Sequence, residues 1–136
     1  MKIGICAIAS PLEIPYLREW FDHHHQMGVE KFYLTLNDWT PFDMVAFRKD
    51  FWKEENDKTI EVLRMDGPRM QYPSFNQMTA LSWNTDLDWA AFLDIDEFLK
   101  IRPHQDGTIR TLEQVLADFS DIPSLTLRWR LFSSGG

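Results

Sequence analysis

The stretch WAAFLDIDEF (residues 89–98) decides the fold class, because an apolar run ends there in a cluster of acidic residues. An apolar run of this length indicates a buried parallel strand, and open α/β sheets bind their ligands at the carboxyl ends of such strands. If the strand geometry persists, Asp94 and Asp96 point the same way and reach one divalent cation, while Glu97 points to the other side. A D-x-D pattern alone has little specificity, so its position at a strand end carries the inference.

The rest of the chain alternates strand-length apolar runs with segments of helical period, which is typical of a parallel sheet covered by helices. The predicted strands are residues 3–9, 31–36, 60–65, 90–93 and 124–129. The predicted helices are a first one from Pro15 to a C-terminal cap at Gly28, then 41–54, 75–83, and 112–119 with Thr108 or Thr111 as its N-cap. The fold class is therefore α/β, with a Rossmann-like sheet flanked by helices. Without repeats or linkers, residues 1–136 form one unit, and the turn-like C-terminal sequence indicates a fragment.

Length and composition limit the kind of protein. The 136 residues are 44% apolar and 26% charged, as in a soluble globular domain, and the formal net charge is −7. This charge argues against nucleic acid as a partner, since binding to a phosphate backbone needs a basic surface. An acidic protein that binds phosphates needs a metal ion or helix N-termini to offset the repulsion.

Cysteine content and hydropathy bear on location. Cys6 is the only cysteine, so an intrachain disulfide is excluded and a small buried side chain in a reducing compartment is expected. The apolar N-terminal run is too short for a signal peptide, and no run has membrane-spanning length. We therefore expect a cytoplasmic protein, with peripheral attachment to the inner face of a membrane left open.

Several local patterns follow one another along nearly the whole chain. They are Cys6-Ala7-Ile8-Ala9, Tyr16-Leu17-x-Glu19-Trp20 with His24 and Gly28-Val29, Gln71-x-x-x-Phe75-Asn76, Trp89-x-Ala91-Phe92-Leu93-Asp94-Ile95-Asp96-Glu97-Phe98, and Trp129-Arg130-x-Phe132-x-Ser134-Gly135. In order and spacing they resemble the glycosyltransferase family 2-like and family 92-like proteins, a group with the nucleotide-sugar-binding GT-A fold.

The resemblance implies transfer of a sugar from a nucleotide-diphosphate donor, by family preference a UDP-sugar, to a glycan or lipid-linked acceptor. It also implies Mn²⁺ or Mg²⁺ at the D-x-D, with Asp96 as the more direct ligand and Asp94 contacting the ribose or a metal-bound water. The charge that develops on the leaving diphosphate must be neutralised, and a metal held by carboxylates does this as a Lewis acid. The competing interpretation of these residues is a solvated acidic turn.

Further donor-binding residues are implied by position in the family pattern. They are Ala7, Ile8 and Ala9, through their backbone, and Asn37, Asp38, Gln71 and Asn76. On local grounds Asn37 and Asp38 equally form a turn after a strand, Asn76 equally caps a helix, and Gln71 equally lies on the surface. The family commonly has Lys-Asn-Glu after the first strand, whereas this chain has Ser-Pro-Leu-Glu at residues 10–13, which leaves the role of Glu13 open.

Several basic and aromatic residues near this region are further candidates for contacts with the ligands. Arg64 and Arg69 either pair with a diphosphate or are solvated. Trp129 and Arg130 end the last predicted strand near the same sheet edge, where they would contact acceptor or donor. The tryptophans mostly belong to the core, although an exposed Trp39 or Trp83 would stack on a sugar ring.

The run His23-His24-His25 does not indicate a metal site. Successive helix residues lie about 100° apart, so three in a row cannot converge on one ion. His24 falls in line with the apolar face of the helix, which predicts a packed core or cap histidine.

No general base can be nominated, because in the family it lies downstream of the D-x-D, and Glu97 is only a remote candidate. An alternative function is a truncated, inactive nucleotide-sugar-binding remnant or interaction domain. A haloacid-dehalogenase-like phosphatase ranks lower, because its D-x-D lies near the start of the chain and is followed two positions later by Thr or Val, where this chain has Phe98.

Overall fold

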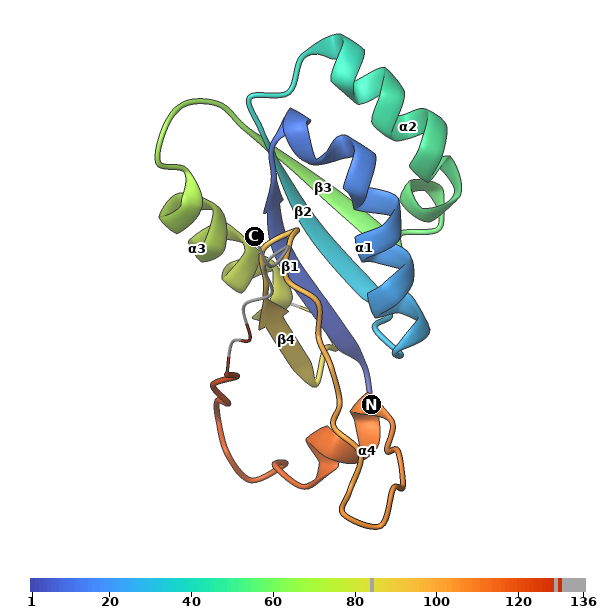
Figure 1. The fold of residues 1–136 in the computed structure, drawn as a ribbon. Coiled ribbons are helices and arrows are strands. Elements are labelled where there is room, and N and C mark those ends of the chain that lie inside the picture. Colours follow the sequence, from blue (N-terminus) through green and yellow to red (C-terminus); the bar gives the residue numbers. More distant parts are fainter. Residues whose placement is uncertain (84, 129, 131–136) are drawn as a thin grey trace.

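A four-stranded parallel sheet forms the centre of the structure, a computed structural model that describes residues 1–83, 85–128 and 130 (Figure 1). The strands are β1 (Ile3–Ala9), β2 (Lys31–Asn37), β3 (Ile60–Met65) and β4 (Trp89–Phe92), in the order β3-β2-β1-β4. The helices are the short 3₁₀ helix η1 (Pro11–Glu13) and the α-helices α1 (Ile14–Gln26), α2 (Pro41–Asn56), α3 (Gln71–Trp83) and α4 (Leu112–Ala117). The predicted Rossmann-like α/β class is confirmed.

The helices cover both faces of the sheet. Helices α1 and α2 lie on one face and α3 lies on the other (Figure 1). The chain runs outward from β1 through β2 to β3 and then returns to the far side of β1 as β4. Right-handed crossovers place helices on opposite faces when the direction of travel reverses. The direction of the strand order reverses between β1 and β4, and this position is the topological switch point of the sheet. Open α/β proteins bind ligands at the carboxyl end of the strands at such a point.

Two clusters of buried side chains fill the space between the layers. Alternate residues of β1 serve each of them: Ile5 and Ala7 belong to the larger cluster under α1 and α2, and Cys6 to the smaller one under α3. Burial raises the pKa of the Cys6 thiol to about 12, in keeping with its expected role as a small buried side chain. Helix α1 buries its apolar stripe at helical spacing, through Leu17, Trp20, Phe21 and His24.

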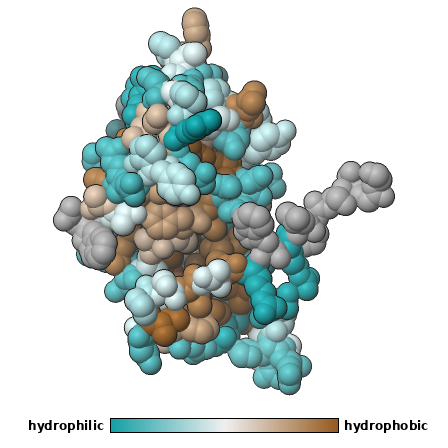
Figure 2. Space-filling model, turned by 90° about the vertical axis from the view of Figure 1, so that its left-hand side faces the viewer, coloured by the Kyte–Doolittle hydropathy of each residue, from teal (hydrophilic) through white to brown (hydrophobic). Residues whose placement is uncertain are grey.

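Strand β4 is less buried than its apolar sequence predicts. Trp89 is only partly buried, and Phe92 is 41% exposed although its ring packs edge-on against Phe75 of α3, with ring centroids 5.2 Å apart. Figure 2 shows hydrophobic surface on this side of the molecule. The prediction of a buried strand is wrong because, in the described part of the chain, β4 pairs with β1 alone and forms an edge of the sheet.

Other predicted boundaries had mixed outcomes. The strands at 3–9 and 60–65 are confirmed, Thr111 caps α4 by accepting the Gln114 backbone N–H (3.2 Å), and Gly28 follows α1 with φ of 103°. Helix α3 begins earlier than predicted because Pro73 lies in its first turn, where its missing N–H is not needed. The predicted strand at 124–129 is wrong for residues 124–128, since alternation alone does not form a strand without a pairing partner, and Trp129 lies outside the described residues.

In the described part of the chain, no helix is long and apolar enough to cross a bilayer.

Candidate functional site

The acidic residues form a tight turn directly after β4. The Leu93 N–H still donates to the Cys6 carbonyl (3.1 Å), so the turn begins beside the last residues of β1. The Glu97 N–H then donates to the Asp94 carbonyl (3.0 Å), and Glu97 Oε2 accepts the Asp94 N–H (2.9 Å). The strand geometry therefore does not persist, and the Glu97 carboxylate turns back onto residue 94. Strand geometry thus gives no reason for Asp94 and Asp96 to point the same way in this turn. We call residues 94–97 the acidic turn.

The side chains of the acidic turn differ in their burial. Ile95 is 2% exposed and packs into the larger core cluster, whereas Asp94 and Asp96 on either side of it are exposed. In the described part of the chain, neither of the two aspartates takes part in a salt bridge. Their carboxylate oxygens are accessible at the switch point between β1 and β4, and oxygen is the ligand that Mg²⁺ prefers.

The end of β1 lies at the same edge, because all four strands run parallel. Ala7 and Ala9 are fully buried, and Ile8 is partly buried on the α3 side. The Ala9 carbonyl accepts the Trp39 Nε1–H (2.8 Å), and Trp39 is only 3% exposed. The prediction of core tryptophans is therefore confirmed for Trp39, and its ring is not exposed for stacking on a sugar but supports the end of β1. The side chain of Trp83 lies outside the described part of the chain.

Asn37 and Asp38 hold the loop that follows β3. Asp38, at φ of 58°, accepts the Gly67 N–H with Oδ1 (2.7 Å), and Asn37 Nδ2 donates to Asp38 Oδ2 (3.0 Å). Asn37 Oδ1 is buried and has no hydrogen-bond partner among the described residues. The turn interpretation is thus confirmed, and the buried Asn37 amide oxygen keeps an unused acceptor position.

Glu13 has a local structural role at the end of β1. Its Oε2 accepts the Ser10 N–H (2.6 Å), while its own N–H donates to the Ser10 carbonyl (3.1 Å). This reciprocal pair closes the turn that leads into α1, as a capping box does.

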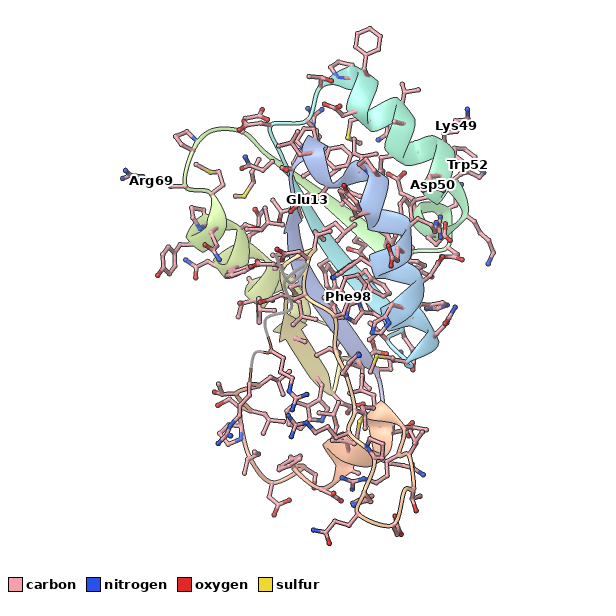
Figure 3. All side chains as sticks on the ribbon, in the orientation of Figure 1. Glu13, Lys49, Asp50, Trp52, Arg69 and Phe98 are labelled. Carbon is pink, nitrogen blue, oxygen red and sulfur yellow. The ribbon has the colours of Figure 1, made fainter. Side chains whose placement is uncertain are left out.

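Most of the remaining predicted residues are exposed and one supports a loop. Arg64 donates through Nη2 to the Trp39 carbonyl (2.8 Å), so it supports the same loop as Trp39. Arg69 is exposed, and Figure 3 shows it extending away from the molecule. Gln71 is exposed in the first turn of α3, and Asn76 is exposed further along that helix, so the cap interpretation of Asn76 is wrong. Arg130 is exposed.

The histidines of α1 all have backbone partners. His24 is fully buried and contacts the Trp20 carbonyl through Nδ1 (2.8 Å), His23 contacts the Leu99 carbonyl through Nε2 (2.8 Å), and His25 contacts the Val29 carbonyl through Nδ1 (3.0 Å). Burial lowers the pKa of His24 to about 4. The prediction of a packed core histidine is confirmed for His24. Sequence periodicity did not reveal the partners of His23 and His24 around residue 99.

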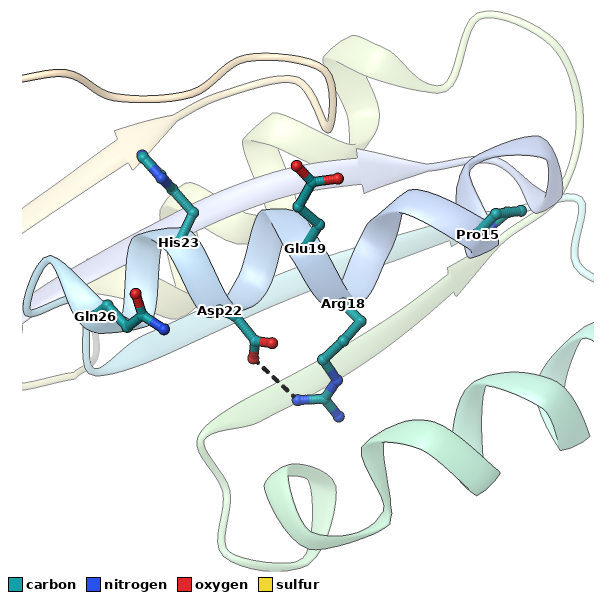
Figure 4. Close-up of a pocket in the computed structure, with 6 residues that line it drawn as sticks. All are labelled: Pro15, Arg18, Glu19, Asp22, His23 and Gln26. Carbon is teal, nitrogen blue, oxygen red and sulfur yellow. Dashed lines mark hydrogen bonds and ion pairs between the residues drawn. The ribbon is translucent and has the colours of Figure 1, made fainter.

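A surface hollow runs along the outer side of α1, away from the predicted site residues (Figure 4). It is lined by Pro15, Arg18, Glu19, Asp22, His23 and Gln26. The guanidinium of Arg18 is engaged there by Asp22 (3.4 Å) and by Glu54 of α2 (2.9 Å). All six lining residues belong to α1, so the hollow is an open part of the surface of that helix.

A Rossmann-like sheet with accessible carboxylates at its switch point defines a class, the α/β proteins that bind ligands at the carboxyl edge. A comparison with known families makes this more specific: the family model of glycosyltransferase family 92 matches residues 9–133, and the chain belongs to that family. A glycosyltransferase family 92 protein of rice (Oryza sativa subsp. japonica) is 28% identical over 116 residues, which cover 81% of this chain and 17% of the rice protein. No solved structure matches the chain. The family 2-like part of the resemblance and the GT-A assignment stay predictions.

Proposed function

We propose that this domain is the donor-binding part of a metal-dependent glycosyltransferase. Its donor is a nucleotide-diphosphate sugar, with UDP as the nucleotide, and the sugar passes to a glycan or lipid-linked acceptor. The observation that carries the proposal is the acidic turn, where Asp94 and Asp96 are exposed beside a buried Ile95 at the switch point. Family membership supports the reaction class.

The number and type of exposed carboxylates in the acidic turn suit a cation that binds together with the diphosphate. In the described part of the chain, no group of three or more His, Cys, Asp or Glu side chains could hold a metal ion. Mg²⁺ at phosphate sites is commonly held by only one or two carboxylates, and phosphate oxygens and waters complete its shell. Asp94 and Asp96 supply those carboxylates in our proposal. A bound Mn²⁺ or Mg²⁺ would neutralise the charge that develops on the leaving diphosphate.

Other residues of the same edge would hold the nucleotide. Gln71 is exposed at the start of α3. Asn37 Oδ1 is a buried acceptor without a partner among the described residues, and it would contact the nucleotide only after a local rearrangement that uncovers it. The backbone at the end of β1 borders the acidic turn. No residue of this domain is proposed as the general base, and Glu97 is poorly suited to that role because its Oε2 accepts the Asp94 N–H.

Variants of the acidic turn test the proposal. Asp96→Ala should abolish metal-dependent UDP binding in calorimetry and leave the thermal unfolding temperature unchanged, because it removes an exposed carboxylate and no core contact. Asp94→Ala should weaken binding, and Asp121→Ala, which removes an exposed carboxylate after α4, serves as the matched control. Wild-type affinity in Asp96→Ala would contradict the assignment. Slow donor hydrolysis without transfer, even with the rest of the protein present, would favour the alternative of an inactive binding remnant.

A further inference from the structure

Three aromatic side chains of α1 bond the backbone at the end of the acidic turn and just after it. Trp20 Nε1–H donates to the Glu97 carbonyl (3.0 Å), and the Leu99 N–H donates to His24 Nε2 (3.2 Å). His23 Nε2 lies 2.8 Å from the Leu99 carbonyl. We call Trp20, His23 and His24 the ring clamp. It joins residues that are 75 to 77 positions apart in the sequence.

The hydrogen-bond partners determine the protonation of both histidines in the ring clamp. A carbonyl oxygen only accepts, so His24 Nδ1 must carry the proton that it donates to the Trp20 carbonyl. His24 Nε2 must then be bare in order to accept the Leu99 N–H. By the same argument His23 Nε2 carries a proton for the Leu99 carbonyl. The ring clamp thus requires one neutral tautomer of His24, in a fully buried site.

Ring packing adds to these bonds. The Phe98 ring stacks on His24, with centroids 5.9 Å apart and planes at 19°, and it meets the edge of His23 at 5.1 Å. Phe98 appears beside α1 in Figure 3. Residues 97–99 are therefore held through both their backbone and their side chains. Together with the Leu93 bond to Cys6 and the burial of Ile95, this fixes the acidic turn on both sides.

We propose that Trp20, His23 and His24 are positioning residues, which hold the acidic turn in the conformation that presents Asp94 and Asp96 together to the cation and diphosphate. This inference rests on the proposed function. Residues that orient metal ligands without touching the metal typically change metal affinity by about tenfold to a hundredfold when they are mutated. The ring clamp acts on the backbone of the turn, one step further from the carboxylates.

His25 provides a matched control within the same helix. Its ring bonds the Val29 carbonyl just after α1, and among the described residues it makes no hydrogen bond or ring contact with residues 94–99. Phe51→Leu serves as a second control, because Phe51 is a buried ring of α2 that packs against Phe21 and Phe47. It lowers stability without touching the acidic turn.

The test variant is His24→Phe, which keeps a ring between Trp20 and Phe98 but removes the acceptor for Leu99. We expect it to lower the affinity for UDP with Mn²⁺ by about tenfold, the lower end of that range, and to speed hydrogen exchange at the Leu99 amide. His25→Gln and Phe51→Leu should keep wild-type affinity and Leu99 protection. Nitrogen NMR of the wild type should show a protonated Nδ1 and a bare Nε2 on His24.

Trp20→Phe, which removes only the donor to Glu97, replaces His24→Phe if the latter does not fold. Wild-type affinity in the folded clamp variant, while Asp96→Ala loses binding, would overturn the positioning role and leave the proposed function standing. An equal loss of affinity in Phe51→Leu would also overturn it, because the effect would then follow stability alone. If the wild type binds no UDP with Mn²⁺, the proposed function fails and the positioning role fails with it.

Discussion

Acidification is expected to destabilise the folded protein through His24. Its pKa is lowered from 6.5 to about 4, chiefly by burial, while its bond to the Trp20 carbonyl acts in the opposite direction and neighbouring His23 lowers it further. Between these two pH values the unfolded chain takes up a proton at His24 and the folded chain does not. Stability therefore rises with pH in this window. The contribution is complete above 6.5 and is lost as the pH falls to about 4.

The size of the effect follows from the same pKa values. Each pH unit between 6.5 and about 4 corresponds to about 1.4 kcal/mol, so the free energy of unfolding should fall by about 3 kcal/mol from this group. Small domains have about 5 to 15 kcal/mol in total, so the loss is a large fraction. The physical cause is chiefly the burial of the imidazole, which disfavours its charged form. Protonation at Nε2 would also remove the acceptor of the Leu99 N–H.

Urea unfolding of the wild type and of His24→Phe across this window measures the effect. Acidic groups with lowered pKa, such as Glu54 beside Arg18, also lose stabilising charge at the acidic end, so only the difference between the two proteins is informative. That difference should shrink by about 3 kcal/mol as the pH falls. The explanation would be refuted if the free energy of unfolding of the two proteins changed in parallel with pH. An NMR titration of His24 with a midpoint near 6.5 would also refute it.

Three further substitutions test local contacts. Thr35→Val leaves the buried Ser74 hydroxyl, which donates to Thr35 Oγ1 (2.6 Å), without that partner, and should cost about 1 to 3 kcal/mol in urea unfolding. Adding Ser74→Ala should restore part of the loss, and strictly additive effects would show that the bond is unimportant. Trp39→Phe removes the donor to the Ala9 carbonyl and should lower stability by about 1 kcal/mol, so an unchanged melting temperature would argue against that bond. Gly28→Ala, at φ of 103° with open space around the new Cβ, should cost about 1 kcal/mol from backbone strain, and a stabilised variant would contradict this.

Local sequence patterns predicted the inner part of the fold well. The apolar runs that became β1 and β3 have the predicted bounds, and the position of His24 on the apolar face of α1 predicted its burial. The exposure of Phe92 and the irregular backbone of residues 124–128 were not predictable in this way. Both depend on which neighbouring strand is available, and that is a property of the sheet and not of the segment.

The location of the candidate site was predictable, but its conformation was not. Asp94 follows an apolar strand in the sequence, and this pattern correctly predicted its position at the carboxyl edge of the sheet. The turn itself depends on the bond between Glu97 and the Asp94 backbone, and on contacts of Trp20 and His24 with residues 97–99. Those contacts arise because β4 pairs with β1 and so brings the segment after β4 alongside α1. No spacing within the sequence contains that information.

The role of the acidic turn in donor binding is measured by calorimetric titration of UDP into the wild-type chain, first with Mn²⁺ and then with EDTA. Our account predicts saturable binding with Mn²⁺ and none with EDTA, because two carboxylates need a cation to hold the diphosphate on a chain of net charge −7. Binding of equal affinity in both conditions would contradict the role of the acidic turn. Absence of binding in either would contradict the assignment of this domain as the donor site.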